Sequence, residues 1–272
     1  MINFIKNYIY LISMRLKYFL NHLDLLSEKK IITTSLEKEI IRKLEKHGFC
    51  VIKDFLNKND CKKIKKKIDL FIKKYPEKLY YSKAKDDRRI HGAELIDNEF
   101  IKKYYNSKFI KKIGFLYTSS ILKNLMTMAN KTKFIRNNLG SGGGWHRDNL
   151  LKQYKSILYL VDVDHSNGPF QLIKQSQELR QVFKDNLKME TDIMTYRYKN
   201  NEVNSIKKNR TVTIEGKAGT LIIVDTSAIH RGSPLKFGTR YALTNYYYPK
   251  KIIKNYFNHF KPKLTINDKI RL

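Results

Sequence analysis

The chain has 272 residues, enough for one large domain or two small ones with an ample hydrophobic core. Hydrophobic residues make up 42% of it, which excludes a disordered chain, and two cysteines cannot build a disulfide framework or a zinc motif. This sparing use of cysteine fits a reducing compartment, so we expect a cytoplasmic protein.

The formal net charge is +30, which raises the possibility of nucleic-acid binding. The lysines are spread over the whole chain, however, and they accompany an excess of Ile, Asn, Tyr and Phe, as an AT-rich coding background would produce. Because no nucleic-acid-binding motif is recognisable, we favour this background over a nucleic-acid surface. A basic surface could still attract an anionic small molecule.

Residues 1–34 are expected to form an N-terminal helical extension. Charged residues interrupt its apolar stretches, so neither a transmembrane span nor a signal peptide is predicted. Apolar residues at helical spacing predict an amphipathic helix packed on the domain; they are Ile5, Ile9, Ile12, Leu16, Leu20 and Leu23. A helix lying on an anionic membrane surface is the alternative, which we favour less.

A capping box at Thr34 and Glu37 predicts the next helix, which should end at Gly48. Its buried face should comprise Leu36, Ile40, Ile41 and Leu44. Residues 49–52 are then a short strand. Asn59 is the expected cap of a further helix that ends before Pro76.

Residues 82–92 are polar and charged, and predict a solvated loop around Asp86-Asp87-Arg88-Arg89, which could belong to a substrate lid. Residues 98–130 return to helical periodicity. From Lys133 onward, short apolar runs alternate with Gly, Pro, Asn and Ser, which predicts consecutive β-strands. The expected strands cover residues 133–138, 156–163, 170–173, 211–214, 220–225 and 240–248.

Helices followed by a β-rich core predict an α+β domain centred on a barrel, over residues 35–250. An insertion of lower regularity occupies residues 177–209, and residues 251–272 are expected to be a basic C-terminal tail. Trp145, the only tryptophan, is expected to pack in the core. Asp225 could lie near the site or could only end a strand, and we do not name it as a catalytic group.

Three residues suggest a metal site. His146 and Asp148 lie two apart, so both side chains point to the same face if the chain is extended there. His230 follows a separate apolar strand, which could bring it to the same end of a barrel. Two histidines and one carboxylate are the ligand set of an open-sided Fe(II) site. Arg240, ten residues after His230, could hold a carboxylate with both arms of its guanidinium group.

The segments around these residues resemble the phytanoyl-CoA dioxygenase family. The Gly-rich loop 140–144 and the following Trp145-His146-Arg147-Asp148 resemble the family's first metal-binding motif. Asn167-Gly168-Pro169 resembles its central turn, and residues 219–233 its segment with the distal histidine. The match extends from about residue 35 to residue 249, and includes Arg240 at the start of the next strand.

This resemblance implies a double-stranded β-helix, or jelly roll, with flanking N-terminal helices. It implies Fe(II) bound by His146, Asp148 and His230, and 2-oxoglutarate with its far carboxylate on Arg240. It further implies oxidation of a small molecule by O2, usually hydroxylation, with release of succinate and CO2. We name Ser233, Asn138 and Asn137 as further candidates for the co-substrate pocket; the extra residue Arg231 blurs the correspondence at Ser233.

Three alternatives remain open at this point. The chain could be a non-catalytic jelly-roll binding protein, although neither a ligand nor the arginine has been lost. It could be an oxygenase that acts on a polyanionic macromolecule, as its charge suggests. It could also be a cupin-like enzyme that uses the metal without a 2-oxo acid, which Arg240 argues against.

Overall fold

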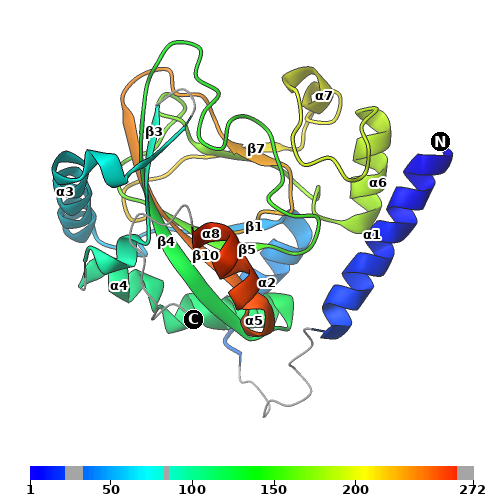
Figure 1. Cartoon of the computed structure of the whole chain (residues 1–272), viewed down its shortest axis with the longest axis horizontal. Coiled ribbons are helices and arrows are strands. Elements are labelled where there is room, and N and C mark those ends of the chain that lie inside the picture. Colours follow the sequence, from blue (N-terminus) through cyan, green and yellow to red (C-terminus); the bar gives the residue numbers. More distant parts are fainter. Residues whose placement is uncertain (22–32, 83–85, 98, 262–272) are drawn as a thin grey trace.

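A computed structural model describes residues 1–21, 33–82, 86–97 and 99–261 of the chain (Figure 1). Its α-helices are α1 (Ile2–Asn21), α2 (Ser35–His47), α3 (Lys58–Lys74), α4 (Phe100–Tyr105), α5 (Lys108–Thr118), α6 (Leu179–Lys188), α7 (Asn200–Asn204) and α8 (Ile253–Phe260). Its strands are β1 (Phe49–Ile52), β2 (Tyr80–Tyr81), β3 (Asp87–His91), β4 (Leu122–Lys133), β5 (Tyr154–Tyr159), β6 (Phe170–Ile173), β7 (Thr211–Ile214), β8 (Leu221–Asp225), β9 (His230–Gly232) and β10 (Thr239–Pro249).

The strands form two antiparallel sheets. The larger has the order β1-β8-β5-β10-β4-β3-β2, and the smaller has the order β7-β6-β9. Strands that are distant in sequence are neighbours in both sheets, as in a jelly roll. A buried cluster that includes Phe170, Leu172, Ile222, Val224 and Ala242 joins the two sheets. The predicted α+β jelly roll with N-terminal helices is therefore confirmed.

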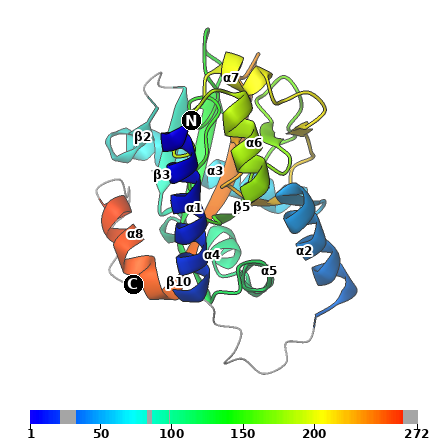
Figure 2. The same cartoon turned by 90° about the vertical axis from the view of Figure 1, so that its right-hand side faces the viewer.

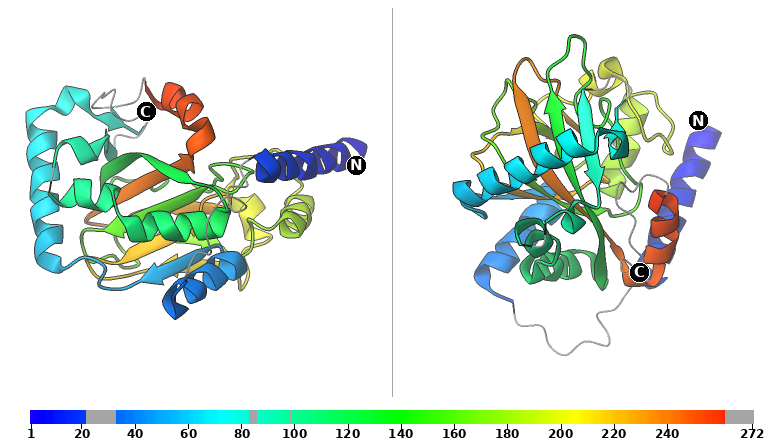
Figure 3. Two further views of the ribbon diagram at one scale, coloured as in Figure 1. Left: turned by 90° about the horizontal axis from the view of Figure 1, so that it is seen from below. Right: turned by 60° about the vertical axis from the view of Figure 1, so that its left-hand side comes forward.

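Helices α2, α3, α4 and α5 cover the outer face of the large sheet (Figure 3, left). The main core lies between these helices and the sheet. It contains Ile64 and Ile68 of α3, Ile113 of α5, and Leu158 and Leu243 of the two central strands. Because one face of the sheet is filled in this way, the opposite face is left to build a site.

The capping box of α2 is confirmed. The Thr34 amide donates to Glu37 Oε2 at 2.8 Å, and the Glu37 amide donates to Thr34 Oγ1 at 3.2 Å. Gly48 ends the helix with φ +85°, which glycine adopts without strain. One predicted member of the buried face is wrong, since Leu36 is 55% exposed. The cap of α3 is Asn57 rather than Asn59, because the Asn57 side chain accepts from the Asp60 amide.

The prediction of helix through residue 130 is wrong at its C-terminal end. Residues 122–133 form β4, which pairs with β10 on one side and with β3 on the other. Nearly all of β4 is buried on both faces. A strand buried on both faces loses the alternation that distinguishes it from a helix in sequence.

The predicted solvated loop at residues 82–92 is also corrected. Residues 87–91 form β3, and Asp87 is 1% exposed. This strand buries charge because Asp87 and Arg89 lie on the same face of it and form an ion pair at 2.7 Å. The strand predicted at residues 133–138 is also misplaced, since β4 ends at Lys133 and a loop follows.

Helix α1 packs on the domain, as predicted, but through a different face. Leu11 is fully buried against Leu150, Val182 and Ile193. The predicted stripe faces outward, and Ile9 and Leu16 are 60% and 57% exposed; Leu23 lies outside the described residues. Figure 2 shows α1 along the surface of the molecule. No helix in the described part of the chain is long and apolar enough to cross a membrane.

Part of the predicted basic tail is ordered structure. Residues 253–260 form α8, whose Ile253 and Phe257 pack on Leu125 and Tyr248 of β4 and β10. Residues 262–272 of that tail lie outside the described part of the chain. In Figure 1, α8 lies in front of the central strands.

Candidate metal centre

His146, Asp148 and His230 come together at one end of the barrel. One ligand atom from each lies within 4.8 Å of the others. Nε2 of His230 is 3.5 Å from one Asp148 carboxylate oxygen, and Nε2 of His146 is 3.8 Å from the other. The two imidazole rings have their centroids 4.3 Å apart. The predicted ligands thus form one cluster in the structure.

Backbone hydrogen bonds connect the two segments that carry these residues. His146 and His230 form an antiparallel bridge, with N···O distances of 3.0 and 2.9 Å. The Asp148 amide donates to the Thr226 carbonyl at 2.9 Å. The side chains of residues 146 and 148 therefore share one face, as their spacing of two requires in extended backbone.

Both imidazoles present Nε2 toward the cluster. Nδ1 of His146 lies 2.8 Å from the Gly144 carbonyl, and Nδ1 of His230 lies 2.9 Å from the Ala228 carbonyl. A carbonyl oxygen can only accept, so each Nδ1 carries the proton and each Nε2 keeps its lone pair. Burial lowers the pKa of His146 and lowers that of His230 to about 3, which keeps both rings neutral at pH 7.

The glycine-rich loop leaves room for His146. Gly142 has φ +91°, and a Cβ at this position would lie 2.3 Å from Cε1 of the His146 ring. Any larger residue would push the ring out of its present position. The glycines that identify the motif in sequence thus have a steric role next to a proposed ligand.

Asp148 is paired with a buried lysine that sequence analysis missed. Lys155 of β5 places Nζ 2.8 Å from Asp148 Oδ2 and 3.9 Å from the centroid of the Tyr246 ring. Burial opposes ionisation of Asp148, but the Lys155 charge outweighs it and holds the pKa of Asp148 below its usual value. Lys155 could have been found only from the strand register, since residues 155, 157 and 159 of β5 all face the interior.

Removing the Lys155 ammonium group tests this pairing. In the metal-free protein, Lys155→Met leaves Asp148 without its counter-ion, and we expect it to lower the free energy of unfolding by about 2 kcal/mol. This is less than for a fully buried pair, because the Asp148 side chain is 26% exposed. A divalent metal would replace the missing charge, so the metal-induced rise in Tm should be larger in Lys155→Met than in the parent protein.

The matched control is Lys217→Met, which breaks an exposed ion pair with Asp162 at 2.9 Å. We expect it to change stability by less than about 1 kcal/mol. Thermal denaturation with and without Co(II) measures both effects. If the two substitutions lowered the stability equally and gave the same metal-induced rise in Tm, Lys155 would not compensate the charge of Asp148.

Arg240 is buried, at 5% exposure, on the inner face of β10. It donates to the Gly168 carbonyl, while its Nε has no hydrogen-bond partner. Gly232 leaves space beside it, since a Cβ there would lie 3.0 Å from one terminal nitrogen of Arg240. A buried guanidinium group with an unused donor is suited to a carboxylate that comes from outside the chain.

Two other predicted pocket residues lie outside the lining of the cavity. The side-chain Nδ2 of Asn138 donates to the backbone carbonyls of Ile135 and Leu235, and its side-chain Oδ1 accepts from the backbone amide of Leu235. Neither Asn138 nor Ser233 lines the cavity, whereas Asn137 does. Both are nevertheless buried near the predicted site, at 8% and 7% exposure.

Asp87 organises the wall on the Arg240 side, and sequence analysis missed it. Its carboxylate accepts from Arg89 at 2.8 Å and from Ser141 at 3.0 Å. Burial opposes its ionisation, but Arg89 and Arg240 hold its pKa below the usual value. The charged segment that looked like a solvated loop therefore supplies a buried ionic wall.

A cavity of about 910 Å³ contains the cluster and Arg240. Polar and charged side chains of the inner strand faces line it, together with aromatic residues at its edge: Tyr80, Tyr246 and Phe260. This volume is at the upper end of the range usual for small-molecule sites. The cavity can therefore hold a co-substrate and a second small molecule together.

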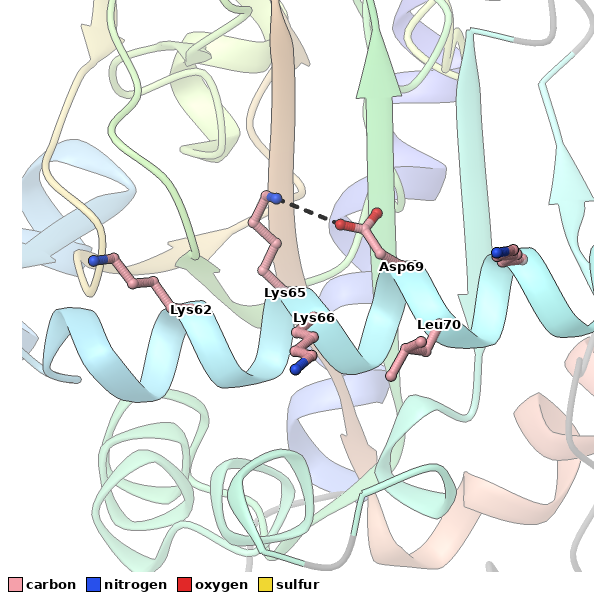
Figure 4. Close-up of a pocket in the computed structure, with 6 residues that line it drawn as sticks. Lys62, Lys65, Lys66, Asp69 and Leu70 are labelled. Carbon is pink, nitrogen blue, oxygen red and sulfur yellow. Dashed lines mark hydrogen bonds and ion pairs between the residues drawn. The ribbon is translucent and has the colours of Figure 1, made fainter.

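A second hollow, of about 340 Å³, lies on the outer face of α3 and shares no residue with this cavity (Figure 4). Lysines line it, and the drawn side chains include the Lys65–Asp69 ion pair at 3.4 Å. Asp69 also pairs with Lys131 and accepts from the Tyr241 hydroxyl. These lysines form the solvated face that their spacing along the helix suggests.

Two residues near the cluster make extensive contacts within the chain. Trp145 is 4% exposed and packs with Ile173 and Ile229. Asp225 is fully buried, and accepts from the Tyr117 hydroxyl and from two backbone amides. The prediction that Trp145 packs in the core is confirmed.

Comparison with known families decides the class of the protein. The sequence profile of the phytanoyl-CoA dioxygenase family matches residues 44–236. The chain belongs to this family. Its members are Fe(II)- and 2-oxoglutarate-dependent oxygenases, and the present chain is an enzyme of this class. The observed donor set of two imidazole nitrogens and one carboxylate fits Fe(II). No curated protein matches the sequence.

Solved structures with similar folds agree with the family. The epimerase SnoN, in complex with Fe3+, alpha-ketoglutarate and nogalamycin RO, is 13% identical with a TM-score of 0.60, covering 79% of this chain and 84% of its own. HygX from Streptomyces hygroscopicus, with nickel, 2-oxoglutarate and hygromycin B bound, is 12% identical with a TM-score of 0.54, covering 78% and 87%. The carbocyclase SnoK from nogalamycin biosynthesis is 14% identical with a TM-score of 0.56, covering 77% and 83%. At these identities, the likeness concerns the fold.

Proposed function

We propose that this family member hydroxylates a small molecule, with Fe(II) held by His146, Asp148 and His230. The convergence of one carboxylate oxygen and two free Nε2 atoms within 4.8 Å supports this assignment most directly. When bound together, Fe(II) and 2-oxoglutarate supply an oxidant made from O2, with succinate and CO2 as co-products. The remaining side chains bind, orient and shield the reactants.

Arg240 is the proposed partner of the far carboxylate of 2-oxoglutarate. Its unpaired Nε and its burial support this role, because a bidentate carboxylate would use donors that the protein leaves free. Asp87 and Arg89 complete the wall beside it, and their mutual ion pair leaves the Arg240 charge available to a ligand. Asn138 remains an indirect candidate, through the loop that its hydrogen bonds to Leu235 stabilise. Ser233 remains a candidate because it is buried near the proposed site.

The substrate is proposed to be a small molecule that bears an anionic group. Arg197 lies at the edge of the cavity, where its guanidinium group donates to the Gly142 carbonyl at 2.9 Å. It comes from the insertion 177–209 and is exposed, so it keeps donors for a ligand. The fold relatives SnoN and HygX were solved with small molecules, nogalamycin RO and hygromycin B.

We also propose a cytoplasmic location. The two cysteines, Cys50 and Cys61, are free and buried, which supports this location.

The test is an anaerobic titration of the protein with Fe(II) and 2-oxoglutarate, followed by the weak visible charge-transfer band of the chelate. We expect the band to appear only when both are present. Admission of O2 should then release succinate, and candidate substrates with and without a carboxylate or phosphate group should raise its rate to different degrees. Absence of the band from folded protein would contradict the proposal and favour the non-catalytic jelly-roll alternative.

A further inference from the structure

Helix α1 has two apolar faces, and only one of them is used within the chain. The inner face packs Leu11 into a buried cluster, and Phe4 and Tyr8 contact the Phe183 ring of α6 with centroid distances of 5.3 and 4.7 Å. The Arg15 side chain donates to the Leu150 and Gln177 carbonyls, both at 2.9 Å. These contacts hold the helix in one orientation on the body.

The second face points away from the body. Its residues follow one another at spacings of three and four, and are between 39% and 72% exposed; they are Ile2, Ile5, Ile9, Ile12, Leu16, Phe19 and Leu20. Successive positions at this spacing lie on one side of a helix. A contiguous apolar face of this kind is comparable to the largest apolar patch on a typical monomer, and such patches are often functional.

The charges around this face are all positive. Helix α1 contains no Asp or Glu, and Lys6 and Lys17 are exposed beside the apolar stripe. The whole chain carries a net charge of +30. An apolar face flanked by lysines is the pattern of a helix that lies in the interface of an anionic bilayer.

We propose that α1 docks the enzyme on an anionic membrane surface through this outer face. The helix does not cross the bilayer, since no described helix is long and apolar enough to do so. Because Leu11 and Arg15 attach α1 to Leu150, two residues after Asp148, the docked helix stays attached to the loop that carries a proposed ligand. The proposal stands independently of the chemistry of the site.

A second copy of the chain is the less suitable occupant. A helix of 20 residues is about 30 Å long and about 10 Å wide, so its outer face offers roughly 300 Å². Stable interfaces bury about 800 Å² per partner. Pairing would also bring together two chains that each carry a charge of +30. An anionic lipid surface attracts the positive charge, and docking on it does not require an interface of the size that a stable dimer needs.

The experiment is co-flotation of the full chain with vesicles of phosphatidylcholine, with or without phosphatidylglycerol. We expect binding only to vesicles that contain phosphatidylglycerol, and weaker binding at high salt. The double variant Ile9→Gln with Leu16→Gln keeps the charge but removes apolar contacts, and should weaken binding about tenfold or more. Its matched control is Leu187→Gln with Phe237→Gln, at exposed positions outside α1, which should bind like the parent protein.

Three outcomes would overturn the proposal. If the parent protein does not bind, or if the α1 variant binds as well as its control, the outer face of α1 does not contact lipid, and any retained binding reflects the general charge. If light scattering shows a dimer that the α1 variant dissociates, this face is an interface between copies. Circular dichroism should show equal melting for both variants, because all four side chains are exposed.

Discussion

Replacing His146 with alanine is expected to abolish Fe(II) binding and 2-oxoglutarate turnover. The change removes one of three proposed ligands, so the affinity for Fe(II) or Co(II) should fall by more than the ten- to hundredfold typical of residues that only support a ligand. The measurements are an anaerobic titration for the chelate band and an assay for succinate.

This result requires that the variant remains folded. His146 contributes one hydrogen bond, from Nδ1 to the Gly144 carbonyl, so the metal-free variant should lose only about 1 kcal/mol of stability. His165→Ala is the matched control, because His165 is exposed and lies outside the cavity. Metal affinity that is unchanged in His146→Ala, or lowered equally in His165→Ala, would contradict the assignment.

The second large effect is expected for Arg240→Met. If Arg240 binds the far carboxylate, removing one partner of a buried charge pair costs about 2–5 kcal/mol, which weakens 2-oxoglutarate binding by about thirtyfold to several thousandfold. Metal binding in the absence of 2-oxoglutarate should change little, since Arg240 is not one of the clustered donors. Calorimetric titration of the metal-loaded protein measures the difference.

A 2-oxo acid without the far carboxylate, such as 2-oxovalerate, sharpens this test. The parent protein should strongly prefer 2-oxoglutarate. Arg240→Met should lose most of that preference, because the far carboxylate of 2-oxoglutarate then has no cationic partner. Arg136→Met is the control, at an exposed arginine on the loop before the glycine motif. A preference retained in Arg240→Met would show that another residue recognises the carboxylate.

The stability of Arg240→Met gives an independent readout. The guanidinium group is buried with one unpaired nitrogen, and within the described residues no carboxylate forms a direct ion pair with it. Burying such a cation is costly, and Asp87 keeps its direct ion pair with Arg89 in the variant, so the apolar methionine should leave the ligand-free protein about as stable as the parent. Addition of metal and 2-oxoglutarate should then raise the Tm of the parent much more than that of the variant.

Local sequence patterns determined much of the framework. The Thr34 capping box, Gly48 and the short β1 strand follow from interactions between residues that are close in sequence, so they could be predicted. The same is true of β6 and β7, whose predicted bounds agree with the structure. The ordered motifs from the glycine loop to Arg240 identified the family, because each motif is short and continuous.

The sequence also indicated which residues gather at the cluster, but not what surrounds them. The spacing of His146 and Asp148 predicts a shared face, and the order of motifs predicts that His230 joins them. Lys155 pairs with Asp148 only because β5 lies between β8 and β10 in the sheet, so its inner face meets the cluster. No local pattern distinguishes this buried lysine from the many solvated ones.

Tertiary structure alone decided the remaining features. Strand β4 looked helical because it is buried on both sides, and β3 looked like a loop because its charges pair inside the barrel. The outward orientation of the α1 stripe is likewise a result of packing. Leu11 and Arg15 find partners on the body, and they turn the more apolar side of the helix to the outside. Periodicity predicts that a helix has an apolar face, whereas the body on which it packs determines which face is covered.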